Sequence, residues 1–138
     1  MNFLVDTNVL SESSKPDPDP KIAAWLYAHK ERAYVSSVSL GELAYGVERL
    51  PPGRKRSALE VWLEATRQSM KGRILPFNSA VALEWGRLVA ELENAGHPMP
   101  VVDSQIAATA RRHGLMLVTG DVEDFRHSGA RLLNPFDA

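Results

Sequence analysis

Acidic residues follow two apolar runs of the sequence, in positions where they could take part in chemistry. Asp6 comes directly after the run at residues 3–5, and Asp121 follows the run at residues 115–118, with Asp124 three residues further on. Both runs are predicted to be buried strands of a parallel sheet, and ligands of such sheets bind outside the carboxyl ends of the strands. An Asp at a strand end can also be a plain turn residue or helix cap.

Two further acids belong to predicted helices. Asp103 falls in the first turn of a helix expected over residues 102–113, and Glu42 lies beside the apolar stripe of its own helix. Asp103 alone could simply complement the helix dipole. Glu42 alone could be the partner of Ser39 in a capping box. Each acid is therefore weak evidence for a site when it is taken alone.

Together the five acids predict a metal site. Each pair of like charges at ~4 Å costs on the order of 4 kcal/mol at an effective dielectric of about 20, and a divalent cation would offset that repulsion. Oxygen donors suit Mg²⁺ or Mn²⁺ better than zinc, and the sequence has no Cys and only four scattered His. The chain has 16 Lys and Arg against 17 Asp and Glu, so without these acids its net charge would be positive. That balance favours a polyanion as substrate and metal-assisted phosphodiester chemistry as the reaction.

The elements that must position these acids alternate along the chain. Short apolar runs are separated by amphipathic helical stretches, which predicts βαβ units. We therefore expect an α/β fold, a three-layer α/β/α sandwich with a central parallel sheet, as a single domain over residues 1–138. The expected strands are residues 3–5, 33–36, 73–77, 115–118 and 131–133.

Cap and turn residues set the expected helix bounds. Thr7 or Asn8 is expected to cap a short helix after the first strand, and Ser39 to begin a capping box in a helix that starts near residues 37–39. The run Pro51–Gly53 ends that helix, and Gly114 is expected to follow the helix at 102–113.

Charge is distributed unevenly along the chain. Residues 49–73 contain seven Lys and Arg against two Glu, which fits either a solvated helix face or a surface for a polyanion. Tyr45 and Arg49 share the Glu42 side of their helix, where they could contact a substrate or be plain surface residues. The absence of Cys excludes a disulfide scaffold. Without a membrane-spanning run or a recognisable signal peptide, a cytoplasmic protein is expected.

Taken in order, these motifs resemble the PIN-domain ribonucleases, and within them the FitB-like branch of the VapC-like toxins of bacterial toxin–antitoxin pairs. The similarity covers nearly the whole chain, and the ordered set is more specific than any single motif. The matching segments are LVDTNVL at 4–10, VSSVSLGEL at 35–43 with Gly46, VDSQIAATA at 102–110, LVTGDVEDF at 117–125 and LLNPF at 132–136.

The resemblance implies that Asp6, Glu42, Asp103 and Asp121 form an acidic site for Mg²⁺ or Mn²⁺, with Asp6 and Asp103 as its most direct ligands. Thr119 matches a hydroxyl residue that would help orient water or phosphate. Many relatives of this branch carry Asn or another residue where this chain has Asp121, so the fourth acid is expected to tune the site.

The resemblance also implies an activity and partners. It implies an endoribonuclease toxin that hydrolyses RNA phosphodiester bonds with metal-activated water. It further implies a PIN-like fold, a homodimer, and a hetero-oligomer with an antitoxin whose C-terminal segment covers the acidic groove. Asp124 matches a further acid whose role varies in the family.

Two alternatives remain open from the sequence. A phosphate-transfer enzyme of the haloacid-dehalogenase type would need a second Asp two residues after Asp6, and position 8 is Asn. A non-catalytic, metal- or protein-binding PIN-like module would keep the same acids for a structural ion or a partner. Asp6→Ala separates the last case, because a binder would keep its partner affinity whereas a nuclease would lose cleavage.

Overall fold

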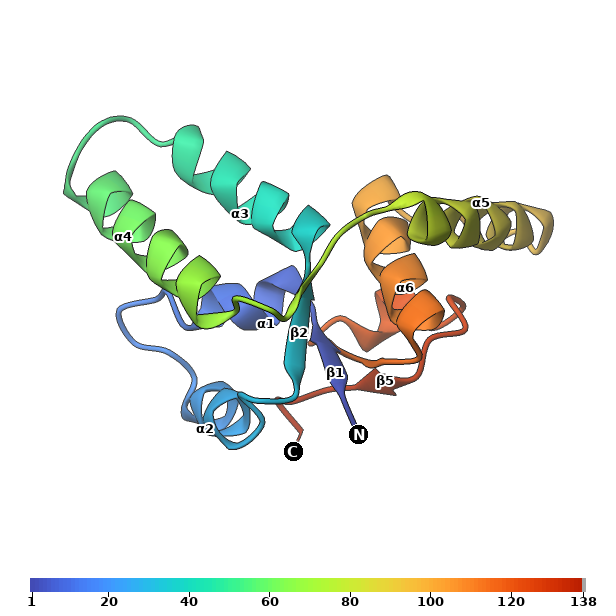
Figure 1. Cartoon of the computed structure of the whole chain (residues 1–138), viewed down its shortest axis with the longest axis horizontal. Helices are drawn as coiled ribbons and strands as arrows, with labels where there is room; N and C mark the ends of the chain where they lie inside the picture. The colour runs from blue at the N-terminus through green and yellow to red at the C-terminus, as the bar shows by residue number, and fades with distance from the viewer. Residues whose placement is uncertain (138) are drawn as a thin grey trace.

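The computed structural model describes residues 1–137, in which five short strands alternate with helices (Figure 1). The strands are β1 (Phe3–Val5), β2 (Ala33–Ser36), β3 (Ile74–Leu75), β4 (Met116–Val118) and β5 (Leu132–Leu133). The helices are α1 (Thr7–Glu12), α2 (Pro20–Ala28), α3 (Ser37–Glu48), α4 (Arg54–Ser69), α5 (Ser79–Asn94), α6 (Val101–His113) and the 3₁₀ helix η1 (Val122–Phe125).

All five strands are parallel, in the order β3-β2-β1-β4-β5. The chain adds strands on one side of β1 first and on the other side afterwards, so the strand order reverses between β1 and β4. The register pairs Val5 with Val118 at the carboxyl ends of these two strands. This reversal is the place where open parallel sheets bind ligands.

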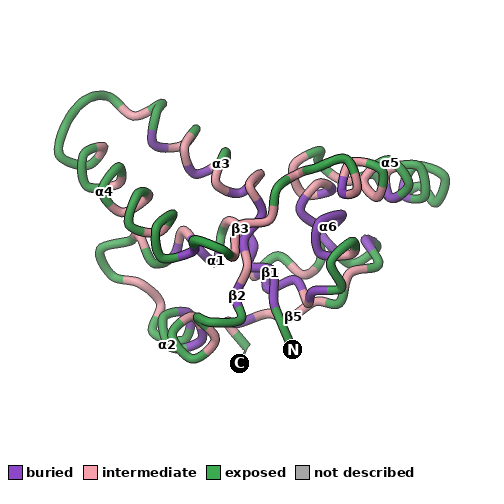
Figure 2. Tube along the Cα trace, in the orientation of Figure 1, coloured by how far each residue is buried: buried purple, intermediate pink, exposed green. Residues whose placement is uncertain are grey.

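The core lies on both faces of the sheet, because successive strand residues point to opposite sides. Phe3 and Val5 of β1 pack with residues of α1, α2, α3 and α4, whereas Leu4 packs with residues of α5 and α6. Figure 2 shows the buried residues concentrated in the strands and on the inner sides of α5 and α6. The three-layer α/β/α sandwich is therefore confirmed.

Helices α3 and α4 form a hairpin that extends away from the sheet (Figure 1). Helix α4 has no buried residue, and most of the hairpin is exposed or only half-buried in Figure 2. The hairpin is therefore tied to the domain mainly through the start of α3 and the apolar side of α4. None of the helices within residues 1–137 is long and apolar enough to cross a membrane.

Two of the expected helix caps are wrong. Helix α1 is capped by Asp6, whose side chain accepts a hydrogen bond from the Thr7 amide, and not by Thr7 or Asn8. Helix α3 is capped by Ser36, so Ser39 lies inside the helix and forms no capping box with Glu42. The expected position of Gly114 after α6 is confirmed, in the left-handed conformation, while Pro20 begins α2 and Asn78 caps α5.

Candidate functional site

Asp6 and Thr119 are the first residues after the two central strands, and they bond to each other. The Asp6 amide donates to the Val118 carbonyl at 2.9 Å, which extends the β1–β4 pairing to the edge of the sheet. There the Thr119 hydroxyl donates to Asp6 Oδ2 at 2.8 Å, and the Thr7 amide donates to Oδ1 at 2.8 Å. Asp6 is only 4% exposed and Thr119 is fully buried. The carboxylate of Asp6 is therefore fixed in the interior by two hydrogen bonds.

Glu42 is held next to this pair by Thr7, the residue after Asp6. The Thr7 hydroxyl donates to Glu42 Oε1 at 2.6 Å and lies 2.8 Å from the hydroxyl of the buried Ser39. Glu42 and Ser39 are one helical turn apart on α3, so both point toward the start of α1. A single threonine thus connects α1 and α3 at the site.

Asp121 is held from the other side by Asn8. The Asn8 amide nitrogen donates to Asp121 Oδ2 at 2.7 Å, and the Asp121 amide donates to the Thr119 hydroxyl at 2.9 Å. The turn between them needs a glycine at position 120, because a Cβ there would lie 2.8 Å from the Phe136 ring. The turn formed by residues 119–121 therefore holds Asp121 close to Thr119 and to Asn8 of α1.

Asp103 reaches the site from the first turn of α6. That helix begins after Pro100, and a run of small buried residues lets it lie close against the sheet. The Trp85 indole donates to the Ser104 hydroxyl at 2.8 Å, which fixes the start of α6 against α5. No hydrogen bond within residues 1–137 fixes the half-buried Asp103 carboxylate, so its side chain is less constrained than those of Asp6, Glu42 and Asp121.

The electrostatics show that these acids lie within reach of one another. Burial raises the pKa of Asp6 to about 6, against the lowering effect of its two hydrogen bonds, and the charges of Asp103 and Glu42 raise it further. The pKa of Asp103 is also raised, first by burial and then by Glu42, Asp124 and Asp121. The charge of Glu42 therefore acts on both Asp6 and Asp103, and the charges of Asp121 and Asp124 act on Asp103.

The donor chemistry of this cluster fits a hard divalent cation. No ion pair in the described part of the chain involves any of the five acids. Oxygen is the only donor element, which suits Mg²⁺ or Mn²⁺. Among residues 1–137, however, no three such side chains are arranged to hold an ion as they stand. Binding therefore requires a side-chain adjustment, and the carboxylate of Asp103 is free to turn, whereas those of Asp6, Glu42 and Asp121 accept hydrogen bonds.

The sequence prediction named acids whose charges act on one another in the structure, but it missed two residues that hold them. Thr7 and Asn8 were expected only as helix caps, whereas they bond to Glu42 and Asp121 across 35 and 113 residues of sequence. The available signal was a hydroxyl and an amide side chain directly after a strand-end Asp. Asn8 also stands where the haloacid-dehalogenase alternative needs its second acid, and its amide is engaged with Asp121.

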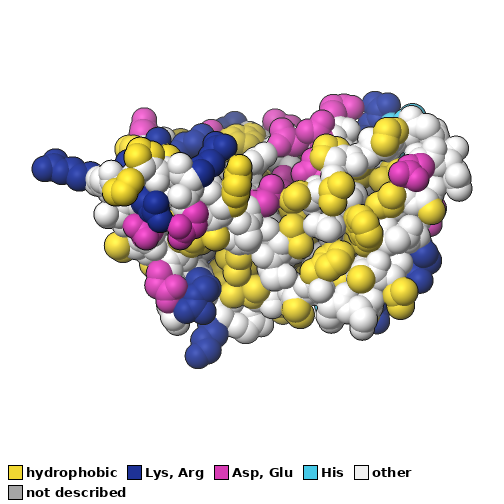
Figure 3. Space-filling model, turned by 90° about the horizontal axis from the view of Figure 1, so that it is seen from above, with side chains coloured by type: hydrophobic (Ala, Val, Ile, Leu, Met, Phe, Trp, Pro, Cys, Tyr) yellow, Lys and Arg dark blue, Asp and Glu magenta, His cyan; other side chains and the backbone are white. Residues whose placement is uncertain are grey.

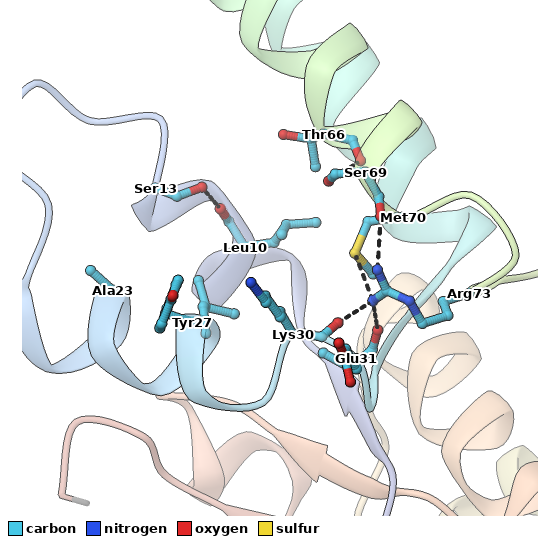
Figure 4. Close-up of a pocket in the computed structure, with 12 residues that line it drawn as sticks. Leu10, Ser13, Ala23, Tyr27, Lys30, Glu31, Thr66, Ser69, Met70 and Arg73 are labelled. Atoms are coloured by element: carbon cyan, nitrogen blue, oxygen red, sulfur yellow. Dashed lines mark hydrogen bonds between the residues drawn. The ribbon is translucent and has the colours of Figure 1, made fainter.

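The acidic site lies on an open face of the molecule. Figure 3 shows acidic side chains near the middle of this face and Lys and Arg side chains projecting at the end formed by the α3–α4 hairpin. An apolar hollow of about 610 Å³ lies elsewhere, between α2 and α4 (Figure 4). It is lined by residues such as Leu10, Tyr27 and Met70, and none of the five acids borders it. Of the five acids, Asp121 and Asp124 are exposed, Glu42 and Asp103 are half-buried and Asp6 is buried, so the cluster opens to the surface at its outer members.

Comparison with known proteins gives a consistent result. Residues 3–129 match the family described as PIN domain. The chain is 34% identical over 137 residues to VapC ribonuclease Y4jK of Sinorhizobium fredii, covering 98% of each protein. It is 35% identical over 136 residues to Toxin FitB of Neisseria gonorrhoeae, covering 97% of this chain and 98% of that one. The structure of FitAcB from Neisseria gonorrhoeae superposes with a TM-score of 0.91, at 34% identity and 99% coverage of both chains.

The buried charge at Asp6 predicts an unusual stability change. The folded protein holds the Asp6 pKa at about 6 against an ordinary 3.8, so ionising this group opposes folding. The penalty is absent below about pH 4 and complete above about pH 6. Asp6→Asn keeps a cap acceptor and removes the charge, so without metal it should raise the free energy of unfolding at pH 7.5 by on the order of 3 kcal/mol.

Urea unfolding in EDTA at pH 4.5 and pH 7.5 measures this difference. The stability gain of Asp6→Asn should be large at pH 7.5 and small at pH 4.5. Asp17→Asn, a change at an exposed loop residue, serves as the control and should show no such gain. An Asp6→Asn protein that is less stable than the wild type at pH 7.5 would contradict the account.

Proposed function

Because the chain belongs to the PIN-domain family of VapC ribonuclease toxins, we propose that it is an endoribonuclease that uses Mg²⁺ or Mn²⁺ to hydrolyse RNA. The observation that carries the metal-dependent part is the buried Asp6 carboxylate. It faces the charges of Asp103 and Glu42, and no cation of residues 1–137 pairs with it. These acids would hold a divalent ion, which would offset the repulsion between them.

In the proposed reaction, water adds an oxygen to phosphorus, the bond from phosphorus to one sugar oxygen breaks, and that oxygen takes up a proton. Asp6 and Asp103 would hold the ion, with Glu42 and Asp121 completing its surroundings. When bound, the ion would lower the pKa of a water molecule and stabilise negative charge on the phosphate. Asp121 is the most exposed of the four proposed ligands and is proposed to tune the site.

The chain's own hydrogen bonds provide the positioning. Thr119 donates to Asp6 and accepts from the amide of Asp121, so one hydroxyl fixes two of the proposed ligands relative to each other. Thr7 does the same for Asp6 and Glu42, through its amide and its hydroxyl. Such partners keep carboxylates in orientations that bare side chains would not hold. Thr119 is thus proposed as a positioning residue.

The partners of this activity are also part of the proposal. The resemblance to toxins of toxin–antitoxin pairs and the name of the Neisseria gonorrhoeae relative, a toxin, support an antitoxin as the protein partner. We propose that the toxin forms a homodimer and a hetero-oligomer with its antitoxin, and that it acts on cellular RNA in the cytoplasm. Light scattering of the purified protein with and without its antitoxin would test the assembly.

Cleavage of total cellular RNA tests the activity. The purified protein, freed of any bound antitoxin by denaturation and refolding, should give discrete products with Mg²⁺ or Mn²⁺ and none with EDTA. Asp103→Asn should lower the cleavage rate by at least about a hundredfold, since it removes a proposed ligand and its charge. Asp17→Asn should cleave like the wild type.

Two results would contradict the proposal. Cleavage that continues in EDTA at the same rate would remove the metal from the reaction. A refolded wild type that cleaves no RNA with any metal, while still binding its antitoxin, would favour a non-catalytic PIN-like module. Mapping the ends of the products would identify the RNA.

Thr119 allows a separate test of positioning. Thr119→Val keeps the shape of the buried side chain but removes the donor to Asp6 and the acceptor for the Asp121 amide. We expect the cleavage rate to fall about 10- to 100-fold and the affinity for Mn²⁺ to fall with it. Thr119→Ser keeps the hydroxyl and should restore most of both. Equal loss in the Ser and Val variants would mean that packing, and not the hydroxyl, is what matters.

A further inference from the structure

The outer face of α3 leads from the acidic site to the tip of the α3–α4 hairpin. Glu42, Tyr45, Gly46 and Arg49 recur at spacings of three and four residues, so they share one side of the helix. The buried residues of the helix, Ser39, Leu43 and Val47, border this side along one edge. From Glu42 to Arg49 the face spans about 10 Å along the helix axis. It is a surface that begins at a proposed metal ligand and runs outward.

Tyr45 and Arg49 form a pair on this face. Tyr45 is 67% exposed, which is high for a large aromatic side chain, and Arg49 is exposed as well. The Arg49 guanidinium carbon lies 5.6 Å from the centre of the Tyr45 ring, within cation–π range. The ring is therefore held by its neighbour on the helix while most of it stays open to solvent. An exposed, oriented aromatic ring next to a cation is what single-stranded nucleic-acid binders use for a base and its phosphate.

The charges around this pair leave an unbalanced positive end. Arg56 and Arg67 are paired with Glu48 and Glu64, and Arg73 donates to backbone carbonyls, so three of the seven basic residues of the segment 49–73 are occupied within the fold. Three exposed residues near the hairpin tip form no ion pair in the described structure: Arg49, Arg54 and Lys55. Figure 3 shows basic side chains projecting at this end of the face among some acidic ones, and further acidic side chains toward its middle. These unpaired cations would suit a polyanion that extends along the hairpin while its reacting phosphate lies next to the acidic site.

Gly46 adds a second indication on the same face. A glycine inside a helix costs about 1 kcal/mol relative to alanine. No atom lies within 4 Å of the position that a Cβ of Gly46 would take, so packing within the chain does not require the glycine. Its missing side chain leaves the backbone open between Glu42 and Arg49, where a ligand can approach closely.

We propose that Tyr45 and Arg49 hold the single-stranded RNA segment next to the cleaved bond, with Tyr45 stacking on a base and Arg49 binding a phosphate. This inference rests on the proposed ribonuclease activity. A second copy of the chain fits the face less well. A symmetric contact through it would bring together the uncompensated positive charges of Arg49, Arg54 and Lys55.

Binding of a fluorescein-labelled single-stranded RNA of roughly a dozen nucleotides tests the proposal in the Asp103→Asn background, where cleavage does not interfere. Adding Tyr45→Ala should weaken binding about tenfold, and Tyr45→Phe should restore it because the ring remains. Arg49→Ala should weaken binding and reduce the salt dependence by about one phosphate contact. In the active protein, the same changes should raise KM more than they lower kcat.

The chain offers a matched control in Tyr27. It is 74% exposed and also carries a cation, with Lys30 Nζ 4.5 Å from its ring, but it lies on α2 at the hollow of Figure 4. Tyr27→Ala should bind RNA like the parent. Equal RNA affinity for Tyr45→Ala, Arg49→Ala and the parent would overturn the proposal, and so would a change of oligomeric mass in Tyr45→Ala. A wild type that neither cleaves nor binds RNA would instead refute the proposed function itself.

Gly46→Ala gives a test in which stability and binding move in opposite directions. The variant should melt at a higher temperature because alanine favours the helix. It should bind the same RNA several-fold more weakly, because the methyl group occupies the open backbone. A more stable Gly46→Ala protein with unchanged RNA affinity would contradict close approach of the strand.

Discussion

The burial of one carboxylate between the two central strands is the constraint on which the site depends. Asp6 directly follows β1, at the place where the strand order reverses. Its backbone hydrogen bond to Val118 of β4 sets it beside Thr119. The protein supplies hydrogen bonds to this carboxylate but no cation, and it adds the charges of Asp103 and Glu42 nearby. Burying this charge therefore lowers the free energy of unfolding, and a divalent ion would neutralise the charge. Active sites often carry such a cost.

The rest of the site follows from keeping that carboxylate in place. Thr7 and Thr119 each bond to Asp6 and to a second acid or its backbone, so the cluster is organised by short polar side chains. Asp103 is the exception, since it arrives on a separate helix without a hydrogen bond of its own within the described structure. A rigid set of acids with one adjustable member suits a site that must accept an ion and then a phosphate. The exposed side of α3 extends the same site toward the remainder of the RNA.

Much of the fold and of the candidate site could be predicted from the sequence, because short segments of the chain carry the relevant physical constraints. The all-apolar run at 115–118, Pro20, Asn78 and Gly114 mark their elements because backbone geometry and burial restrict which residues fit. The acids could be singled out because parallel strands end at a common edge. The sequence around the start of α3 allows either Ser36 or Ser39 to cap the helix, so it did not reveal that Ser36 is the cap. Nor could it reveal the bonds of Thr7 and Asn8, which join residues far apart in the sequence.

Direct binding of Mn²⁺ tests the central claim, namely that uncompensated carboxylates at the sheet edge take up a divalent ion. The signal of free aqueous Mn²⁺ can be followed by electron paramagnetic resonance as protein is added. The account predicts that the wild type removes this signal, that Mg²⁺ restores it by competition, and that a folded protein carrying both Asp6→Asn and Asp103→Asn leaves it unchanged. Equal uptake of Mn²⁺ by the wild type and the double variant would contradict the account, as would no uptake by either.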